Sequence, residues 1–240
     1  MATLFVSDIH LDESRPEHVR GFLDFLAGEA ARAEALYILG DLFEAWIGDD
    51  EESALADTVA QALAALGAQG VPCRFMHGNR DFLLGTGFEA RTGVKLLPDP
   101  VSVDLYGVPT LLSHGDVFCI GDRHYQELRT IVRQHSWQQR FLALPLPTRR
   151  ELASAARAGS KAHTQRQIPV LMDVDDEAVT RAMRATRATR LIHGHTHRPA
   201  IHRFQVDGMS AERVVLAPWY EAASCVAVDA GGVREIPLPR

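Results

Sequence analysis

Seven side chains in this sequence have the types and the order expected of a site for two metal ions. They are carboxylates, imidazoles and one amide: Asp8, His10, Asp41, Asn79, His114, His195 and His197. Oxygen and nitrogen ligands of this kind suit divalent manganese, iron, zinc or cobalt, and no thiolate is among them. Two such ions roughly 3.5–4 Å apart can hold a phosphoryl oxygen and activate water for in-line attack. The pattern therefore predicts a phosphoesterase.

The seven side chains lie in five short blocks: Ser7–His10, Gly40–Asp41, Gly78–Asp81, Ser113–Asp116 and His193–His197. At least three blocks follow an apolar run that is typical of a buried strand: Thr3–Val6, Ala35–Leu39 and Thr110–Leu112. Ligands at the carboxyl ends of strands in an α/β sheet converge on one crevice. Asp, Asn and Gly also favour turns and caps, which is the alternative interpretation. Five ordered blocks favour a single site over that alternative.

Arg80 restricts the kind of bond that such a site would cleave. Arginine does not give up its proton near neutral pH, so it cannot protonate an alkoxide leaving group. It is a fixed cation that can bind phosphate through two hydrogen bonds. A phosphate leaving group has a second pKa near ~6 and can depart unprotonated. Arg80 therefore favours cleavage of a pyrophosphate, unless its side chain is only a solvated arm beside the site.

The five blocks resemble those of the calcineurin-like metallophosphoesterases, over Leu4 to Ala217. The resemblance implies an α/β fold, a two-sheet sandwich flanked by helices, in which Asp41 bridges two metals. One metal would be completed by Asp8, His10 and His197, and the other by Asn79, His114 and His195. Most of these enzymes have a histidine, able to act as an acid, where this chain has Arg80.

Longer stretches resemble one family within that group, the UDP-2,3-diacylglucosamine diphosphatases of lipid A biosynthesis. They are Phe5–Leu11, Gly40–Asp50, His77–Leu83, Ser113–Asp116, Met172–Val174 and His193–His197. This resemblance implies a hydrolase with two Mn²⁺ per chain, peripheral on the cytoplasmic leaflet of the inner membrane. Water would attack the α-phosphorus of the acylated UDP-sugar and release UMP and 2,3-diacylglucosamine 1-phosphate. The leaving group would then be a sugar phosphate, as the chemistry of Arg80 requires.

The same resemblance implies roles for individual residues. Catalytic residues would be Asp41, Asn79, Arg80 and His195. Substrate would be bound by Asn79, Arg80, Asp122, Ser160, Thr164, Gln167 and His195. The family more often has Asn and Lys where this chain has Thr164 and Gln167. Threonine keeps a hydrogen-bonding group, whereas the charge that Gln167 lacks would have to come from Arg157 or Arg166.

Charge is unevenly spread along the chain of 240 residues, whose formal net charge is −6. The segment Arg123–Pro169 holds nine Lys or Arg and two Glu, so it carries +7 and leaves −13 for the rest. The same segment carries an apolar group: Trp137, Phe141, Leu142, Leu144 and Leu146. We expect two or three inserted helices here, forming a cap (123–169) on a core made of residues 1–122 and 170–240. Pro145 and Pro147 would break the cap into separate helices.

Three functions are open for this cap. It is a helical subdomain with solvated arginines, a cap that binds an acyl chain and docks on an anionic membrane, or a nucleic-acid groove. The charge of −13 elsewhere would repel a long polyanion, and aromatic side chains for base stacking are few. We therefore expect no nucleic acid, and no protein partner is evident. The acidic loop Phe43–Asp50 either tunes the metals or is solvated.

The remaining pattern completes the fold class. Helices are expected at Glu17–Ala30, Ser53–Ala68 and Asp175–Arg187, and a hairpin at Val101–Leu112. Antiparallel strands are expected at Ile201–Asp207, Arg213–Ala217, Ser224–Val228 and Val233–Pro237. The first strand begins almost at Met1, no apolar run approaches ~18 residues, and the three cysteines are expected to be reduced. These features predict a protein of the cytoplasm or of the cytoplasmic membrane face.

Two other functions are consistent with this sequence. One is a soluble nucleotide pyrophosphatase or cyclic-nucleotide phosphodiesterase of the same superfamily. The other is an inactive or regulatory module that keeps only the fold, against which the complete ligand set argues. Activity on acylated as opposed to plain UDP-sugars separates the first two functions, and failure to bind metal would favour the last.

Overall fold

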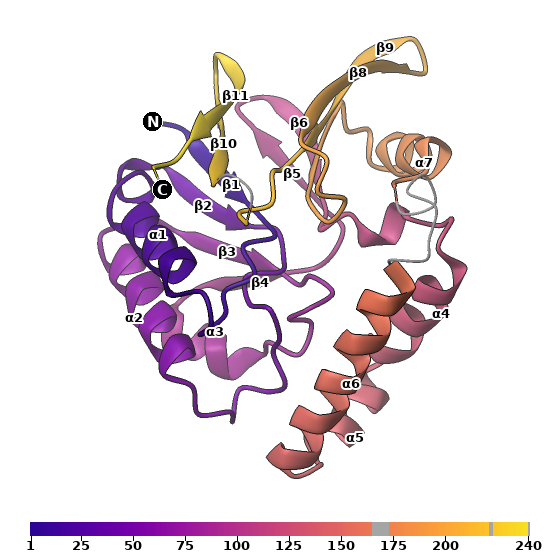
Figure 1. The fold of residues 1–240 in the computed structure, drawn as a ribbon. Coiled ribbons are helices and arrows are strands. Elements are labelled where there is room, and N and C mark those ends of the chain that lie inside the picture. The colour runs from indigo at the N-terminus through magenta and orange to yellow at the C-terminus, as the bar shows by residue number, and fades with distance from the viewer. Residues whose placement is uncertain (165–172, 221–222, 240) are drawn as a thin grey trace.

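The chain forms two sheets that pack face to face (Figure 1). The computed structural model describes residues 1–164, 173–220 and 223–239, with the side chains of 160–164 left aside. The first sheet has the order β11-β10-β1-β2-β3-β4. Its parallel strands are β1 (Thr3–Val6), β2 (Ala35–Ile38), β3 (Cys73–Met76) and β4 (Lys95–Leu97). The strands β10 (Ser224–Asp229) and β11 (Gly232–Pro237) extend it in antiparallel fashion.

The second sheet has the order β5-β6-β7-β9-β8. It contains β5 (Val101–Leu105), β6 (Val108–Leu112), β7 (Arg190–His193), β8 (Ala200–Val206) and β9 (Met209–Val215). The central strands β6, β7 and β9 run parallel, and β5 and β8 close the two edges as antiparallel hairpins.

Helices cover the outer faces of the two sheets. The helices α1 (Pro16–Ala27), α2 (Ala54–Ala68) and α3 (Thr86–Thr92), with the short turn η1 (Ala30–Arg32), lie on the first sheet. The helix α7 (Asp176–Thr186) packs on the second sheet beside the turn η2 (Asp116–Phe118). Ser53 caps α2 by accepting a hydrogen bond from the Ala56 amide at 3.2 Å.

Side chains of the buried strands point alternately to the two faces of the sheet, and this explains the two apolar layers of the core. Leu4 and Val6 of β1 point to the helices, while Phe5 between them points into the space between the sheets. There Phe5 shares one buried cluster with Met76 of the first sheet and Leu112 of the second. Because side chains alternate across a strand, a fully buried strand serves two apolar layers. The predicted two-sheet sandwich flanked by helices is confirmed.

Two elements differ from the sequence-based expectation. The strand β9 begins at Met209, four residues before the expected start at Arg213. Asp207 and Gly208 have φ of 51° and 79°, which makes a tight hairpin that joins β8 to β9. The α3 helix and the short β4 strand were not expected, because the segment between Asn79 and Val101 has little periodic apolar pattern.

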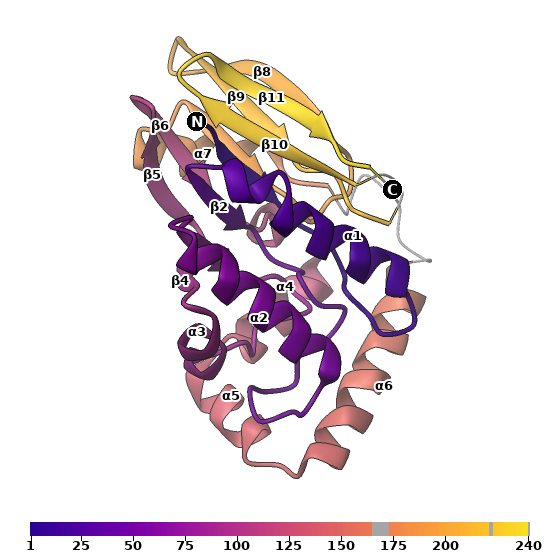
Figure 2. The ribbon, with the colours of Figure 1, turned by 90° about the vertical axis from the view of Figure 1, so that its left-hand side faces the viewer.

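The segment after residue 122 forms three helices: α4 (Arg123–Val132), α5 (His135–Leu142) and α6 (Leu146–Thr164). Figures 1 and 2 show them gathered at one end of the molecule, beyond the edge of both sheets. No residue of α4 or α5 is fully buried. Within the described part of the chain, no helix combines the length and the apolar composition needed to cross a membrane.

Candidate metal centre

All seven predicted ligands lie just after the ends of parallel strands. Asp8 and His10 follow β1, Asp41 follows β2, and Asn79 follows β3. His114 follows β6, and His195 and His197 follow β7. The loops of the two sheets therefore meet in one place, where ligands from both sheets contact one another.

Five of these residues have an unusual backbone. The φ angle is 53° at Asp8, 54° at His10, 54° at Asp41, 67° at His195 and 56° at His197. Left-handed conformations are uncommon outside glycine, although Asp and His tolerate them better than most residues. Such conformations persist where the surroundings enforce them, and they cluster at functional sites. Here they turn successive side chains toward one point.

The glycines of the blocks let these loops approach one another. A Cβ atom at Gly78 would collide with the carboxylate and the amide of Asp41. A Cβ atom at Gly194 would collide with the Asp8 carboxylate and the Ser7 hydroxyl. An alanine at either position would therefore push a carboxylate out of the site.

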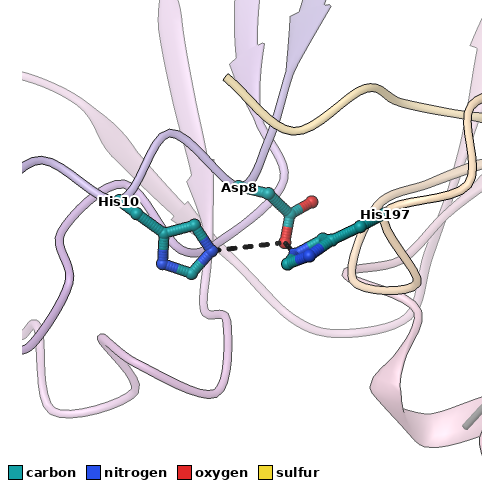
Figure 3. A group of neighbouring side chains, drawn as sticks. All are labelled: Asp8, His10 and His197. Atoms are coloured by element: carbon teal, nitrogen blue, oxygen red, sulfur yellow. Dashed lines mark hydrogen bonds and ion pairs between the residues drawn. The ribbon is translucent and has the colours of Figure 1, made fainter. Parts of the chain in front are cut away.

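One group of side chains consists of Asp8, His10 and His197 (Figure 3). Nε2 of His197 lies 3.2 Å from Oδ1 of Asp8, and Nε2 of His10 lies 4.0 Å from the same oxygen. The two imidazoles face the Asp8 carboxylate from either side. These three residues are the set expected for one metal.

A second group consists of Asp8, Asp41 and His114, with Asn79 and His195 beside them. The Asn79 Oδ1 atom lies 3.0 Å from Nε2 of His114 and 2.9 Å from Nδ1 of His195. Asp41 also reaches the first group, because its Oδ2 lies 3.7 Å from Nε2 of His10 while its Oδ1 lies 3.9 Å from Nε2 of His114.

These groups fit divalent cations. Separations of 3.7–4.0 Å are too long for hydrogen bonds. Two atoms that each lie ~2.1 Å from one metal ion are separated by at most ~4.2 Å, so these atoms are close enough to share an ion. Nε2 of His10 is buried without a hydrogen-bond partner among the described residues, and a coordinate bond would satisfy it.

The electrostatics of the site also favour a cation. Burial pulls the pKa of His114 down, but the carboxylates of Asp41, Asp8 and Asp116 raise it to about 9. In contrast, burial and then the charge of His114 lower the pKa of His195 to about 4. The buried carboxylates thus bind positive charge, and a metal would displace the proton because ligands bind in their deprotonated form.

Neighbouring groups fix several of these side chains. Nδ1 of His114 donates to the Leu39 carbonyl at 2.8 Å, so Nε2 is left to face the cluster. Oδ2 of Asp8 accepts from the Ser7 hydroxyl at 2.6 Å and from the His195 amide at 2.9 Å. Hydrogen bonds of this kind set the orientation of ligands before a metal binds.

Asp81 was not among the predicted site residues, yet it supports the site. Its buried carboxylate accepts from the amides of Leu42 at 2.7 Å, Gly78 at 2.9 Å, Asp41 at 3.3 Å and Phe43 at 3.4 Å. Burial, and after it the charge of Asp41, raise the pKa of Asp81 to about 6. Asp81 therefore joins the Asp41 loop to the Asn79 loop. Its place in the third block was the only signal for it in the sequence.

The acidic residues of the loop after Asp41 have partners in the structure, although the Asp50 side chain is also 61% exposed. Oε2 of Glu44 lies 3.2 Å from Nδ1 of His10. The Asp49 carboxylate accepts from the Trp46 indole at 3.0 Å and from the Gly85 and Phe88 amides at the start of α3. Asp50 pairs with the buried Arg149 of α6. Each acid therefore has a separate structural partner, which the sequence did not show.

A cavity of about 720 Å³ opens beside the metal groups, between the loops after β2 and β3 and the helices α4–α6. Its lining includes the polar side chains of Asn79 and Arg80 and the apolar side chains of Trp137, Phe141 and Leu144. Arg80 is fixed at its backbone, whose amide donates to Oδ1 of Asp41 at 2.8 Å. Its Nε atom is buried, and no side chain or backbone group in the described part of the chain forms a hydrogen bond with it. A buried guanidinium donor without a partner, beside a metal centre, suits an anionic ligand.

The other predicted substrate contacts are less well placed or lie outside the description. Asp122 caps α4 by accepting from the Tyr125 amide at 3.0 Å, and it is not among the described residues that line the cavity. Ser160 and Thr164 lie in α6, in the stretch whose side chains are not described. Gln167 and Arg166 lie outside the described residues, whereas Arg157 lines the cavity.

Comparison with known proteins agrees with this geometry. The model of the calcineurin-like phosphoesterase family matches residues 1–199. The chain belongs to this family, as the five blocks predicted.

Among curated proteins, it is 49% identical to the UDP-2,3-diacylglucosamine hydrolase of Xanthomonas campestris pv. campestris, over 97% of both chains. It is 49% identical to the hydrolase of that name from Stenotrophomonas maltophilia, over 97% of this chain and 96% of that protein. It is 48% identical to that of Escherichia coli O6:H1, over the full length of both. The narrower resemblance seen in the sequence is thus also confirmed.

Proposed function

We propose that this protein hydrolyses the pyrophosphate bond of UDP-2,3-diacylglucosamine as a step of lipid A biosynthesis, releasing UMP and 2,3-diacylglucosamine 1-phosphate. The names of its full-length relatives support the reaction. The cavity carries the proposal on the structural side, because its lining combines Arg80, whose Nε atom is buried beside the metal centre, with large apolar side chains. A substrate with a pyrophosphate and acyl chains has both of these parts.

The proposed cofactors are two Mn²⁺ ions, held by Asp8, His10, Asp41, Asn79, His114, His195 and His197. When bound, such a pair polarises a phosphoryl oxygen and lowers the pKa of water, which would then attack the α-phosphorus. Arg80 would meet the negative charge of the pyrophosphate with its unpartnered donor, and Asn79 and His195 would border the same phosphates. No general acid is needed, since the departing sugar phosphate is a stable anion.

The three helices would act as a cap on the rest of the molecule, with residues 123–169 as the cap and 1–122 and 170–240 as the core. Trp137 and Phe141 stack with ring centroids 5.1 Å apart along the cavity wall, where acyl chains would lie. Leu142 faces differently from its neighbours, since it is 38% exposed and is not among the described residues that line the cavity. We propose that exposed Leu142 and Ile131, with the basic residues of this segment, dock on the anionic cytoplasmic leaflet of the inner membrane.

A manganese-dependent assay on UDP-2,3-diacylglucosamine, with UMP as the monitored product, tests this function. We expect turnover that a chelator abolishes and that Mn²⁺ restores. UDP-N-acetylglucosamine without the long acyl chains is the matched substrate, and we expect a much lower kcat/KM for it. Equal kcat/KM on both substrates would instead indicate a general nucleotide pyrophosphatase. Binding to anionic vesicles should weaken as salt is added, because screening reduces the attraction of the basic residues.

A further inference from the structure

Two residues outside the predicted ligand set contact the histidines of the first metal group. Each contact is made at Nδ1, the outer ring nitrogen, since Nε2 of both histidines faces Asp8. The first is Glu44, whose Oε2 lies 3.2 Å from Nδ1 of His10. This nitrogen is buried, and the angle of the contact leaves it without an aligned hydrogen bond. The terminal torsion of a glutamate is soft. A small rotation of the carboxylate would therefore complete the bond.

Neighbouring groups hold Glu44 in a position from which it can form a hydrogen bond with Nδ1 of His10. Its amide donates to the Leu11 carbonyl at 3.0 Å, which ties the loop after β2 to the loop after β1. Arg15 contacts both Glu44 and His10. Its guanidinium lies 3.6 Å from Oε2 of Glu44 and donates to the His10 carbonyl at 2.9 Å. The arginine, the carboxylate and the imidazole thus form a chain that ends at the metal group.

The second residue is Tyr220, whose hydroxyl forms a hydrogen bond with Nδ1 of His197. Nε2 of His197 faces the Asp8 carboxylate, which can only accept, so without a metal Nε2 donates to Asp8 and Nδ1 accepts from the Tyr220 hydroxyl. With Nε2 bound to a metal, Nδ1 would carry the proton and donate to the Tyr220 oxygen. The neighbouring residue anchors this segment. The Trp219 amide donates to the Asp8 carbonyl at 3.1 Å, and its buried ring packs against Phe22 and Phe25.

The second metal group lacks such a side-chain support at His114, which donates to a backbone carbonyl. Backbone cannot be removed by substitution, whereas Glu44 and Tyr220 can. The two metal sites therefore differ in a way that mutagenesis can resolve.

We propose that Glu44 and Tyr220 are positioning residues, which orient His10 and His197 for the metal ion of the first group. The inference rests on the proposed two-metal site. A carboxylate or another acceptor on the outer nitrogen of a ligating histidine fixes the tautomer and the ring orientation. Loss of such a partner typically weakens metal binding about 10–100-fold.

The test titrates Mn²⁺ into the metal-free full-length protein and follows free Mn²⁺ by electron paramagnetic resonance. For Glu44→Ala and Tyr220→Phe, we expect one of the two ions to bind about 10–100-fold more weakly, with the other unchanged. Glu44→Gln keeps an acceptor and should lie between Glu44→Ala and the wild type. Excess Mn²⁺ should restore most of the kcat of these variants.

Glu51→Gln and Tyr106→Phe are the matched controls. Glu51 lies in the same loop but pairs with Arg150, and the Tyr106 hydroxyl contacts Thr3 and Glu34. Both controls should bind two ions as the wild type does. The melting temperature of each metal-free variant separates a general structural effect from a metal effect, and we expect it to remain near that of the wild type.

His10→Ala distinguishes the failure of this inference from the failure of the proposed site. If His10→Ala binds two ions with unchanged affinity, the metal assignment itself is wrong. If His10→Ala loses one ion while Glu44→Ala and Tyr220→Phe keep both at wild-type affinity, the positioning role is overturned. Should Glu44→Ala fail to fold, Glu44→Gln and Tyr220→Phe decide the outcome in the same titration.

Discussion

Replacement of Asp81 by asparagine should destabilise the fold and loosen the metal centre together. Each oxygen of the Asp81 carboxylate accepts from two backbone amides, Oδ1 from Gly78 and Asp41 and Oδ2 from Leu42 and Phe43. At about pH 8 the carboxyl is ionised, because even its raised pKa of about 6 lies below that pH. An asparagine has only one oxygen, so its NH2 group would face two amide donors.

The size of the effect follows from this count of donors. A buried N–H group that loses its acceptor costs about 1–3 kcal/mol. The contacts at 3.3 and 3.4 Å are weak, so most of the loss comes from one short bond and from the opposed donors. We therefore expect Asp81→Asn to lower the free energy of unfolding by about 2–4 kcal/mol. For a chain of this size, that corresponds to a fall in Tm of roughly 4–16 °C.

Scanning calorimetry of the metal-free protein measures this fall. Asp104→Asn is the matched control, since Oδ1 of Asp104 also accepts from a backbone amide, that of Gly107 at 2.8 Å, but in an exposed turn. Water can replace the acceptor there, and we expect a change within about 0.5 kcal/mol. A Tm for Asp81→Asn as high as that of the control would refute the role of Asp81 as a shared acceptor for the two loops.

The remaining predictions concern the ligands, Arg80 and the cavity. Asp41→Ala should abolish turnover and lower the bound Mn²⁺ at both sites, as measured by metal analysis after purification; an active variant with two ions per chain would contradict the bridging role. Arg80→Ala should keep its metals but lose about 10²-fold or more in kcat, and Arg80→His should not recover wild-type turnover, because the leaving group needs no proton. Phe141→Ser and Leu144→Ser should each raise KM for the acylated substrate roughly tenfold, from ~1.5 kcal/mol of lost apolar burial, without changing hydrolysis of an unacylated UDP-sugar; equal loss on both substrates would show that these side chains only hold the cap together.

Much of the site was predictable because its residues obey a local rule. Asp8 and Asp41 each follow a short apolar run, and such runs become central parallel strands whose carboxyl ends must meet. The glycines within the blocks could be read in the same way, since Gly78 and Gly194 stand where a Cβ atom would collide with a carboxylate. The order of the blocks along the chain thus indicated both the fold and the place of the metal centre.

The helices after residue 122 show where a sequence pattern stops being informative. Trp137 and Phe141 were expected to capture an acyl chain, and the cavity beside them fits that hypothesis. Leu142 belongs to the same apolar run, yet it is exposed. Which face of a short helix meets a cavity depends on how that helix is tilted by its neighbours. Arg149 is such a neighbour, because it bonds to Ile47 and Asp50 from within α6 and thereby joins the cap to the loop after Asp41.

The sequence by itself therefore determined the kinds of ligand, their order, and the choice of an arginine where a proton donor is usual. Only the tertiary structure decided which side chains hold those ligands in place. Glu44 meets His10, and Tyr220 meets His197, across contacts that no spacing along the chain specifies. The physical reason is that strand ends converge by backbone geometry alone, whereas outer contacts depend on side-chain packing between segments that are distant in the sequence.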